Sequence, residues 1–185
     1  MQYGLARMGA ALLALIMTFS TTTQSAAAAE YDFQLEREVG AVKIFKAPDK
    51  EQGYQRIRVQ TVSDHPLEVL LHLNTDVKGW AGWMPKVLQA DYVEPGTDRY
   101  IAHTRFSSPW PVKNRDSVIE SKVTRNPDSG VVRLAFRTVE DRVPPSADYV
   151  RIPYVDGFWE FTPLPSGQVG VVYEILINPG GNVPK

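Results

Sequence analysis

Histidine and carboxylate side chains are the residues of this sequence that first suggest metal binding or acid–base catalysis. His65 and His72 are seven residues apart in a segment with helical spacing, and His103 lies in a segment with strand spacing. Zinc sites use closely spaced Cys, His and carboxylate ligands, and this sequence has no cysteine. Glu140 and Asp141 are adjacent, so on a strand they would point to opposite faces. We therefore expect structural histidines, a solvated acidic pair, no metal site and no cofactor.

Three signatures of catalysis or nucleotide binding are absent from the sequence: the nucleophile elbow G-x-S-x-G, the phosphate-binding G-x-x-x-x-G-K-[ST] and the zinc-protease H-E-x-x-H. Tyr100, Tyr173 and Glu174 are the remaining candidates for acid–base groups inside an apolar cavity, where such groups need shifted pKa values. These three residues form no recognisable dyad in the sequence. The sequence therefore favours a protein that is not an enzyme.

Alternation of apolar and polar residues dominates the sequence after residue 40. Around residue 135, Val132, Leu134 and Phe136 fall on one face of an extended chain, and Arg133 and Arg137 fall on the other. This period of two is typical of half-buried antiparallel strands. The alternation predicts strands over 42–47, 54–62, 86–94, 99–106, 117–124, 131–139, 149–154, 158–163 and 168–177.

The segment 65–75 has a helical period instead, with three leucines on one side. Pro66 suits the first turn of a helix, and Asp64 or His65 could serve as its N-cap. We expect a helix over this range, preceded by two strands and followed by six or seven. Because the apolar side of the helix must be buried, the compact solution is an α+β fold in which a curved antiparallel sheet surrounds the helix.

The composition of the sequence suits one globular domain. It has 185 residues, 43% of them hydrophobic, and a formal net charge of −1. Without cysteine, the fold must rest on its core rather than on disulfides. Lys and Arg are scattered among acidic residues and form no stripe that a phosphate backbone could follow, so we do not expect nucleic acid as a partner.

The first 29 residues differ from the rest of the chain. Arg7 is their only charged residue, 12–19 is an apolar run, and small residues occupy 25–29. This pattern is typical of a secretory signal peptide, and the apolar run is shorter than the ~20 residues that span a bilayer. We expect a signal peptide over 1–29 and an exported protein, which in a Gram-negative host would be periplasmic. An uncleaved N-terminal anchor is the alternative.

Four short motifs follow one another in the remaining chain. They are Trp80 and Trp83 in GWAGWMPKV, Pro109-Trp110-Pro111 with Arg115-Asp116, Gly157-Phe158-Trp159 followed by Pro163, and GGNVP at 180–184. In this order they resemble the START domain, the lipid-transfer module related to the steroidogenic acute regulatory protein, over about residues 35–185. The resemblance implies a helix-grip fold that encloses an apolar tunnel for one lipid.

The resemblance also implies that residues 107–116 form a rigid connection near the cavity mouth. The two prolines stiffen this stretch, and Trp110 either contacts the lipid or only holds the shape of the loop. Arg115 and Asp116 are expected to pair or to bind the loop backbone. In the family a long C-terminal helix packs over the cavity after the GGxxP element, and this sequence ends before such a helix, at Lys185. Either the sequence is a fragment or something else closes the cavity, and without such a helix we expect one apolar side of the tunnel to be open.

Strand alternation identifies the side chains expected in the tunnel wall. Thr104 and Ser121 are the expected polar spots, because a buried hydroxyl is tolerated when a ligand group pairs with it. The predicted ligand-binding residues are Tyr100, Ala102, Thr104, Phe106, Trp110, Ile119, Ser121, Leu134, Phe136, Trp159, Phe161, Tyr173 and Ile175.

The sequence thus predicts a START-like domain over 30–185 that binds a hydrophobic molecule, a lipid or a sterol-like compound, for transport, storage or sensing. Transient contact with a membrane would accompany transport. Two alternatives stay open. The wider helix-grip superfamily includes cyclases and aromatases, so the protein could be an enzyme that acts on a hydrophobic ketone. It could also be a sensor or interaction module whose core is filled.

Overall fold

The alternating segments form one sheet in the computed structural model, which describes residues 31–181. Its strands are β1 (Gln34–Val39), β2 (Val42–Pro48), β3 (Gln55–Ser63), β4 (Val87–Glu94), β5 (Arg99–Phe106), β6 (Arg115–Arg125), β7 (Val132–Thr138), β8 (Val150–Arg151), β9 (Tyr154–Pro163) and β10 (Val169–Asn178). They are ordered β1-β2-β3-β10-β9-β7-β6-β5-β4, and β8 pairs with β6. All neighbours are antiparallel except β6 and β8. The predicted signal peptide and most of the GGNVP motif lie outside the described residues.

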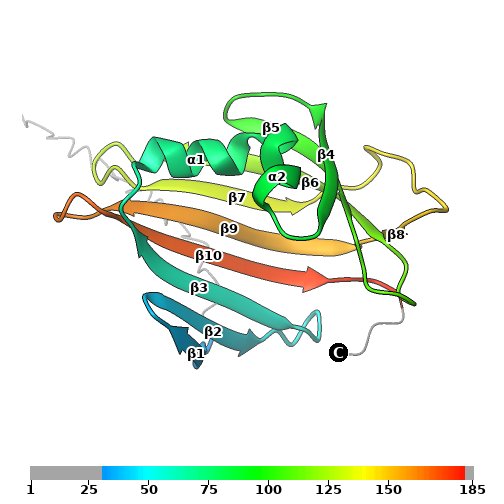
Figure 1. The fold of residues 1–185 in the computed structure, drawn as a ribbon, viewed down its shortest axis with the longest axis horizontal. Coiled ribbons are helices and arrows are strands. Elements are labelled where there is room, and N and C mark those ends of the chain that lie inside the picture. The colour runs from blue at the N-terminus through cyan, green and yellow to red at the C-terminus, as the bar shows by residue number, and fades with distance from the viewer. Residues whose placement is uncertain (1–30, 182–185) are drawn as a thin grey trace, which may run out of the picture. The chain divides into compact units, whose positions relative to one another are not determined.

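A helical segment connects β3 to β4 and covers the concave face of the sheet. It consists of α1 (Leu67–Thr75), the short 3₁₀ helix η1 (Val77–Gly79) and α2 (Trp80–Trp83). Figure 1 shows α1 and α2 in front of the strands, with α1 along β7 and β9. The predicted α+β helix-grip architecture, a curved antiparallel sheet around a helix, is confirmed. Among the described residues, no helix is long and apolar enough to span a membrane.

The start of α1 differs from the prediction. Its N-cap is Pro66 and not Asp64 or His65, and no side chain caps the helix. The Ser63 hydroxyl instead accepts a hydrogen bond from the backbone N–H of His65, at 3.2 Å. The Pro66 backbone oxygen accepts the first hydrogen bonds of the helix, from the N–H groups of Val69 at 3.0 Å and Leu70 at 3.2 Å, and the fixed φ of proline suits the approach to a helix.

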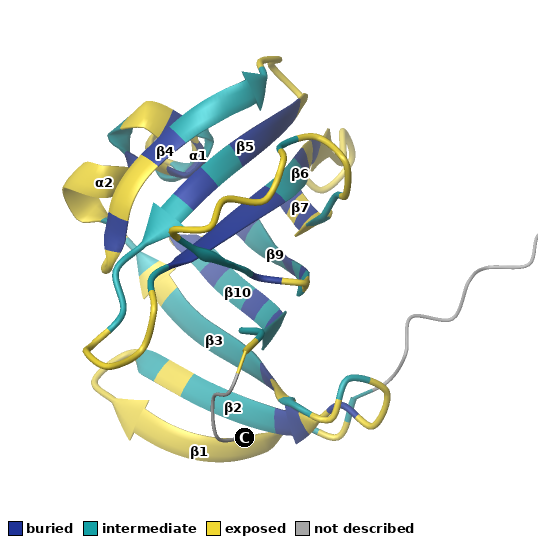
Figure 2. Ribbon diagram, turned by 90° about the vertical axis from the view of Figure 1, so that its right-hand side faces the viewer, coloured by how far each residue is buried: buried dark blue, intermediate teal, exposed yellow. Residues whose placement is uncertain are grey.

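Two strand predictions need correction. β1 was missed because it is an edge strand whose six residues are all exposed, so its sequence has no apolar face (Figure 2). The strands expected over 149–154 and 158–163 are the two-residue β8 and the long β9. Gly157 interrupts the alternation inside β9. An added Cβ there would lie 2.1 Å from the Glu174 carbonyl oxygen and 2.8 Å from the Phe136 ring, so the glycine permits a close approach within the strand.

The concave face supplies the apolar core under α1. Leu71 of α1, Val77, Trp80 and Phe161 of β9 belong to one buried cluster that extends across β5, β6 and β7. Figure 2 shows the same pattern: β5 and β6 are largely buried, whereas β1 is exposed along its length. Burial of this cluster is the main favourable contribution to folding in a chain without disulfides.

The convex face carries ion pairs where the concave face carries apolar side chains. Glu174 of β10 is buried and pairs with Arg58 at 2.7 Å and with Arg56 at 3.2 Å. Arg56 also forms an ion pair with Asp156 of β9, at 3.0 Å. The Arg58 guanidinium lies 3.8 Å from the centre of the Phe33 ring, which partly shields this pair from water. These contacts connect β3, β10 and β9 on the side away from the core.

Candidate functional site

A cavity of about 380 Å³ lies between the concave face of the sheet and the segment that contains α2. Its size falls within the range of small-molecule sites in proteins. The structure brings together ten of the residues predicted for the tunnel wall, from five different strands. These are Tyr100, Thr104, Phe106, Ile119, Ser121, Leu134, Phe136, Trp159, Tyr173 and Ile175.

Three predicted residues do not line this cavity. Ala102 and Phe161 point to the concave side but are fully buried in the apolar core. Phe161 and Leu71 of α1 belong to the same buried cluster, so this end of the concave face is filled. The Ala102 side chain is a single methyl group. Trp110 lies outside the cavity and is 93% exposed.

Other lining residues were missed by the sequence analysis. Ser117 extends the alternation of Ile119 and Ser121, and Ile177 extends that of Tyr173 and Ile175, so strand alternation could have identified both. The remaining ones come mainly from the helical segment and the start of β9, where alternation carries no signal. The missed lining residues are Asn74, Trp80, Trp83, Met84, Pro85, Ser117, Ile152, Val155 and Ile177.

Stacked aromatic rings form part of the cavity wall. Tyr173 of β10 lies directly opposite Trp159 of β9, and their ring centres are 4.2 Å apart at an interplanar angle of 28°. Phe136 of β7 continues this surface, with its ring centre 6.3 Å from that of Tyr173. Such rings are large, rigid and apolar, and they provide a flat surface against which a hydrocarbon can pack.

The cavity wall carries no formal charge. Its described lining residues include no Asp, Glu, Lys, Arg or His. Burial raises the pKa of Tyr173 to about 12, and burial likewise raises that of Tyr100 to about 12 against the opposing effect of a hydrogen bond with Ser121. The Tyr100 hydroxyl donates to the backbone oxygen of Asn74 at 3.1 Å. Both phenols are therefore neutral at physiological pH.

The three candidates for acid–base catalysis are divided between the two faces of the sheet. Tyr100 and Tyr173 line the cavity. Glu174 lies on the opposite face of β10, where both of its oxygens are engaged by Arg56 and Arg58. Its carboxylate therefore cannot act with the two phenols on one substrate.

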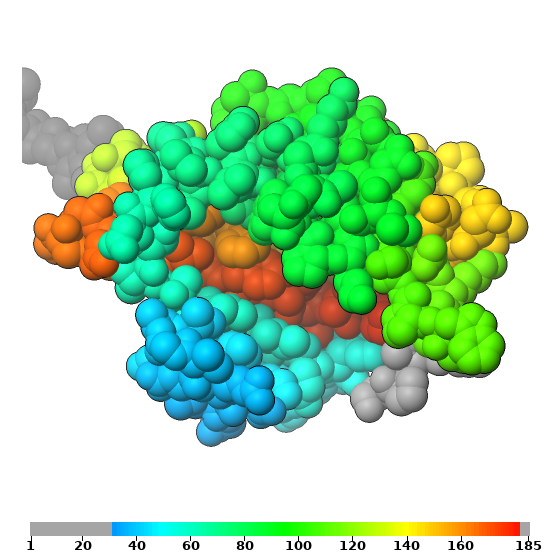
Figure 3. All heavy atoms as spheres, viewed as in Figure 1, coloured from blue at the N-terminus to red at the C-terminus, as the bar shows by residue number. Residues whose placement is uncertain are grey.

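A groove on the face shown in Figure 3 leads toward this cavity. β9 and β10 are visible at its bottom in orange and red, between the green residues of the helical segment and the blue to cyan residues of β1 to β3. Ile175 of β10 and Trp83 of α2 both line the cavity, and the groove runs between these two elements. Trp83 is 42% exposed, so it borders the entrance and also contacts solvent.

The connection between β5 and β6, residues 107–114, is held by hydrogen bonds to the chain around it. The backbone N–H of Ser108 donates to Asn114 Oδ1 at 3.0 Å, and Arg115 donates to the backbone oxygen of Lys113. The backbone N–H of Ser107 donates to the Lys86 oxygen, at 2.8 Å, beside the Met84-Pro85 part of the cavity wall. Trp110 makes no comparable contact and projects into solvent, which does not support its role as a staple for the loop.

Asp116 faces away from this loop and does not pair with Arg115. It is 2% exposed and accepts hydrogen bonds from His103 Nε2 at 2.8 Å and from Arg151 Nε and Nη2 at 3.0 and 2.8 Å. Burial would raise the pKa of Asp116, but the hydrogen bonds from Arg151 and His103 outweigh it and hold that pKa below its ordinary value. Asp116 thereby links β6 to both β5 and β8.

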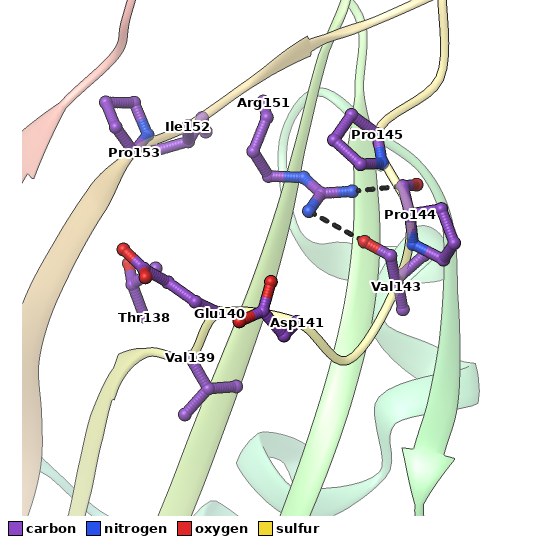
Figure 4. A pocket seen from close by; sticks show the side chains of 10 residues that line it. All are labelled: Thr138, Val139, Glu140, Asp141, Val143, Pro144, Pro145, Arg151, Ile152 and Pro153. Atoms are coloured by element: carbon purple, nitrogen blue, oxygen red, sulfur yellow. Dashed lines mark hydrogen bonds between the residues drawn. The ribbon is translucent and has the colours of Figure 1, made fainter.

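A second hollow, of about 450 Å³, lies beside Arg151 between the 139–145 loop and the start of β9. Figure 4 shows that the Arg151 guanidinium is held there by the backbone oxygens of Val143 and Pro144. Its positive charge is already balanced by Asp116, and the acidic residues at the rim are exposed to water. The apolar, uncharged cavity under α2 is the better candidate for a ligand.

The comparisons with known proteins agree with this architecture. No family model matches the chain. An uncharacterized protein of Pseudomonas aeruginosa is 25% identical over 155 residues, which cover 83% of this chain and 76% of that protein. The crystal structure of a fragment of the STAR-related lipid transfer protein from Xanthomonas axonopodis superposes with a TM-score of 0.76 at 23% identity and covers 82% of this chain and 85% of that one. Human StAR-related lipid transfer protein 5 gives a TM-score of 0.73 at 20% identity and covers 88% and 77%. The chain therefore has the START-like helix-grip fold.

The buried Asp116 cluster predicts a pH-dependent loss of stability. Asp116→Asn should lower the free energy of unfolding at pH 7 by roughly 3 kcal/mol, because it leaves the partly buried Arg151 guanidinium without its carboxylate partner. The folded-state pKa of Asp116 lies below the unfolded value of about 3.9, so its contribution is complete above that value and is lost as the pH falls through the folded pKa. Urea denaturation between pH 3 and pH 8 should therefore show a difference from the native chain that is constant above about pH 5 and shrinks below about pH 4. Asp128→Asn, in an exposed turn, is the control, and a difference that grows on acidification would contradict the assignment.

The exposed position of Trp110 predicts that it contributes little to stability. Trp110→Ala should change the free energy of unfolding by less than about 0.5 kcal/mol, as is usual for surface positions. Trp80→Ala, in the buried cluster, should lower it by roughly 3–5 kcal/mol. Denaturant melts of the two variants would test this, and equal losses would show that Trp110 is a structural staple.

Proposed function

We propose that this protein is a START-like carrier that binds one hydrophobic molecule, a lipid or sterol-like compound, in the cavity between the sheet and α2. The observation that carries the proposal is the composition of that cavity: it is lined by aromatic and aliphatic side chains from five strands and the helical segment, with a few hydroxyl groups among them. At about 25 cal/mol per Å² of apolar area, removal of a few hundred Å² of ligand surface from water contributes several kcal/mol. The STAR-related structural neighbours are named as lipid transfer proteins, which agrees with this function.

Binding without turnover is the interpretation that the electrostatics of the site support. General acid–base catalysis needs a group whose pKa lies near the working pH. The cavity offers Tyr100 and Tyr173, both with pKa values near 12, and Glu174 is committed to the other face of the sheet. These features favour a carrier over the cyclase or aromatase alternative.

Transfer of a lipid requires contact with a membrane, and the surface near the cavity has suitable residues for brief contact. Trp110 and Val112 are exposed on the 107–114 connection, and Lys113 follows them. Trp83 is exposed at the edge of the cavity itself. Indole rings favour the interface between lipid and water, where the ring is buried and its N–H stays hydrated. The signal-peptide pattern of residues 1–29 supports a place outside the cytoplasm, which is the periplasm in a Gram-negative host.

A variant that fills the cavity tests the proposal. Ile119→Trp places an indole in the cavity, so mass spectrometry of an organic extract of the purified protein should detect at least about tenfold less bound lipid than in the native chain, a loss of roughly 1.4 kcal/mol or more. Lys122→Trp, on the exposed face of the same strand, is the matched control and should retain the lipid. An extract of the native protein that contains no hydrophobic compound, together with no uptake of added lipid, would overturn the carrier proposal.

A further inference from the structure

Two residues of the cavity wall each have a buried polar side-chain atom with no hydrogen-bond partner within the described part of the chain. The atoms are the indole nitrogen Nε1 of Trp80 and the hydroxyl oxygen Oγ1 of Thr104. Both residues are deeply buried, with 5% and 1% of their surface exposed. A third such atom, Nε of Arg56, belongs to the ion-pair network on the other face of the sheet.

Unpartnered buried polar groups are rare in folded proteins because each one loses its hydrogen bonds to water without replacement. At the wall of a cavity, a ligand can supply the missing partner. The Trp80 indole is a donor only, and the Thr104 hydroxyl can both donate and accept. A ligand group that satisfies both must therefore contain an oxygen that accepts hydrogen bonds.

Two further hydroxyl-bearing side chains line the cavity and add no charge. Ser117 is the direct cross-strand partner of Thr104 and places a second hydroxyl-bearing side chain in the wall. Tyr173 also lines the cavity. Burial raises the pKa of its hydroxyl, and this hydroxyl has no hydrogen-bond partner among the described residues. A carboxylate or phosphate placed here would lose its hydration and find no cation, which is strongly unfavourable.

We propose that the cavity selects an uncharged lipid whose hydroxyl or carbonyl oxygen accepts hydrogen bonds from Trp80 Nε1 and Thr104 Oγ1, and that it excludes lipids whose charged headgroup would have to enter. This inference deepens the carrier proposal and rests on it. It makes the polar end of the ligand, and not only its hydrocarbon, a determinant of binding.

A matched series of twelve-carbon compounds separates these contributions. The full chain would be loaded with the neutral dye Nile red at pH 8, and dodecane, dodecanol, methyl dodecanoate and dodecanoate would compete for the site. Dodecanol and methyl dodecanoate should bind roughly three- to tenfold more tightly than dodecane, as expected for a net hydrogen bond. Dodecanoate, which is ionised at pH 8, should bind at least about tenfold more weakly than dodecanol.

Thr104→Val tests the assigned residue, since it removes the hydroxyl at nearly constant shape. It should reduce the preference for dodecanol over dodecane by roughly threefold. Thr124→Val, at an exposed position of β6, should leave the whole series unchanged. Equal binding of dodecane and dodecanol, or of dodecanol and dodecanoate, would overturn this inference while the carrier proposal stands. Failure of Nile red and of every competitor to bind would overturn the carrier proposal as well.

Discussion

The antiparallel register between β9 and β10 is the constraint on which both faces of the sheet depend. It places Tyr173 opposite Trp159, so that their rings stack in the cavity wall. It also places Glu174 opposite Phe158 on the other face, where Glu174 pairs with Arg58. Because successive side chains alternate, a slip of one residue would move the carboxylate into the apolar cavity and the phenol among arginines. Apolar contacts on one side and ion pairs on the other therefore stabilise the same register.

The cavity exists because the helical segment covers the concave face unevenly. At one end, Leu71 of α1 packs in the same buried cluster as Phe161 and Val169, and the space is filled. At the other end, α2 is only four residues long, and the strands below it carry small hydroxyl-bearing residues such as Ser117 and Ser121. The fold thus combines a packed half, which supplies stability, with an open half that can accept a ligand. Among the described residues, the ones that line the cavity include no ionised side chain.

Strand alternation was sufficient to predict most of the cavity wall, because each residue in a strand faces the same side as the residue two positions away. This rule placed Ile119, Tyr173 and Ile175 correctly on the concave face. It could not place Trp80, whose side chain comes from a short helix that only tertiary packing positions. It also could not show that Phe161 lies under α1 rather than in the cavity, since both sites belong to one face of one strand. β1 escaped detection because an exposed edge strand has no apolar face.

The most direct test of this account is to locate a bound ligand. A photoactivatable diazirine analogue of dodecanol would be bound to the full chain, irradiated and mapped by peptide mass spectrometry. The account predicts adducts on the concave side of β6, β9 and β10 and on α2, at positions such as Ile119, Trp159 and Trp83. Excess dodecanol should suppress these adducts. Adducts confined to the convex face or to the hollow beside Arg151 would show that the cavity under α2 is not the binding site.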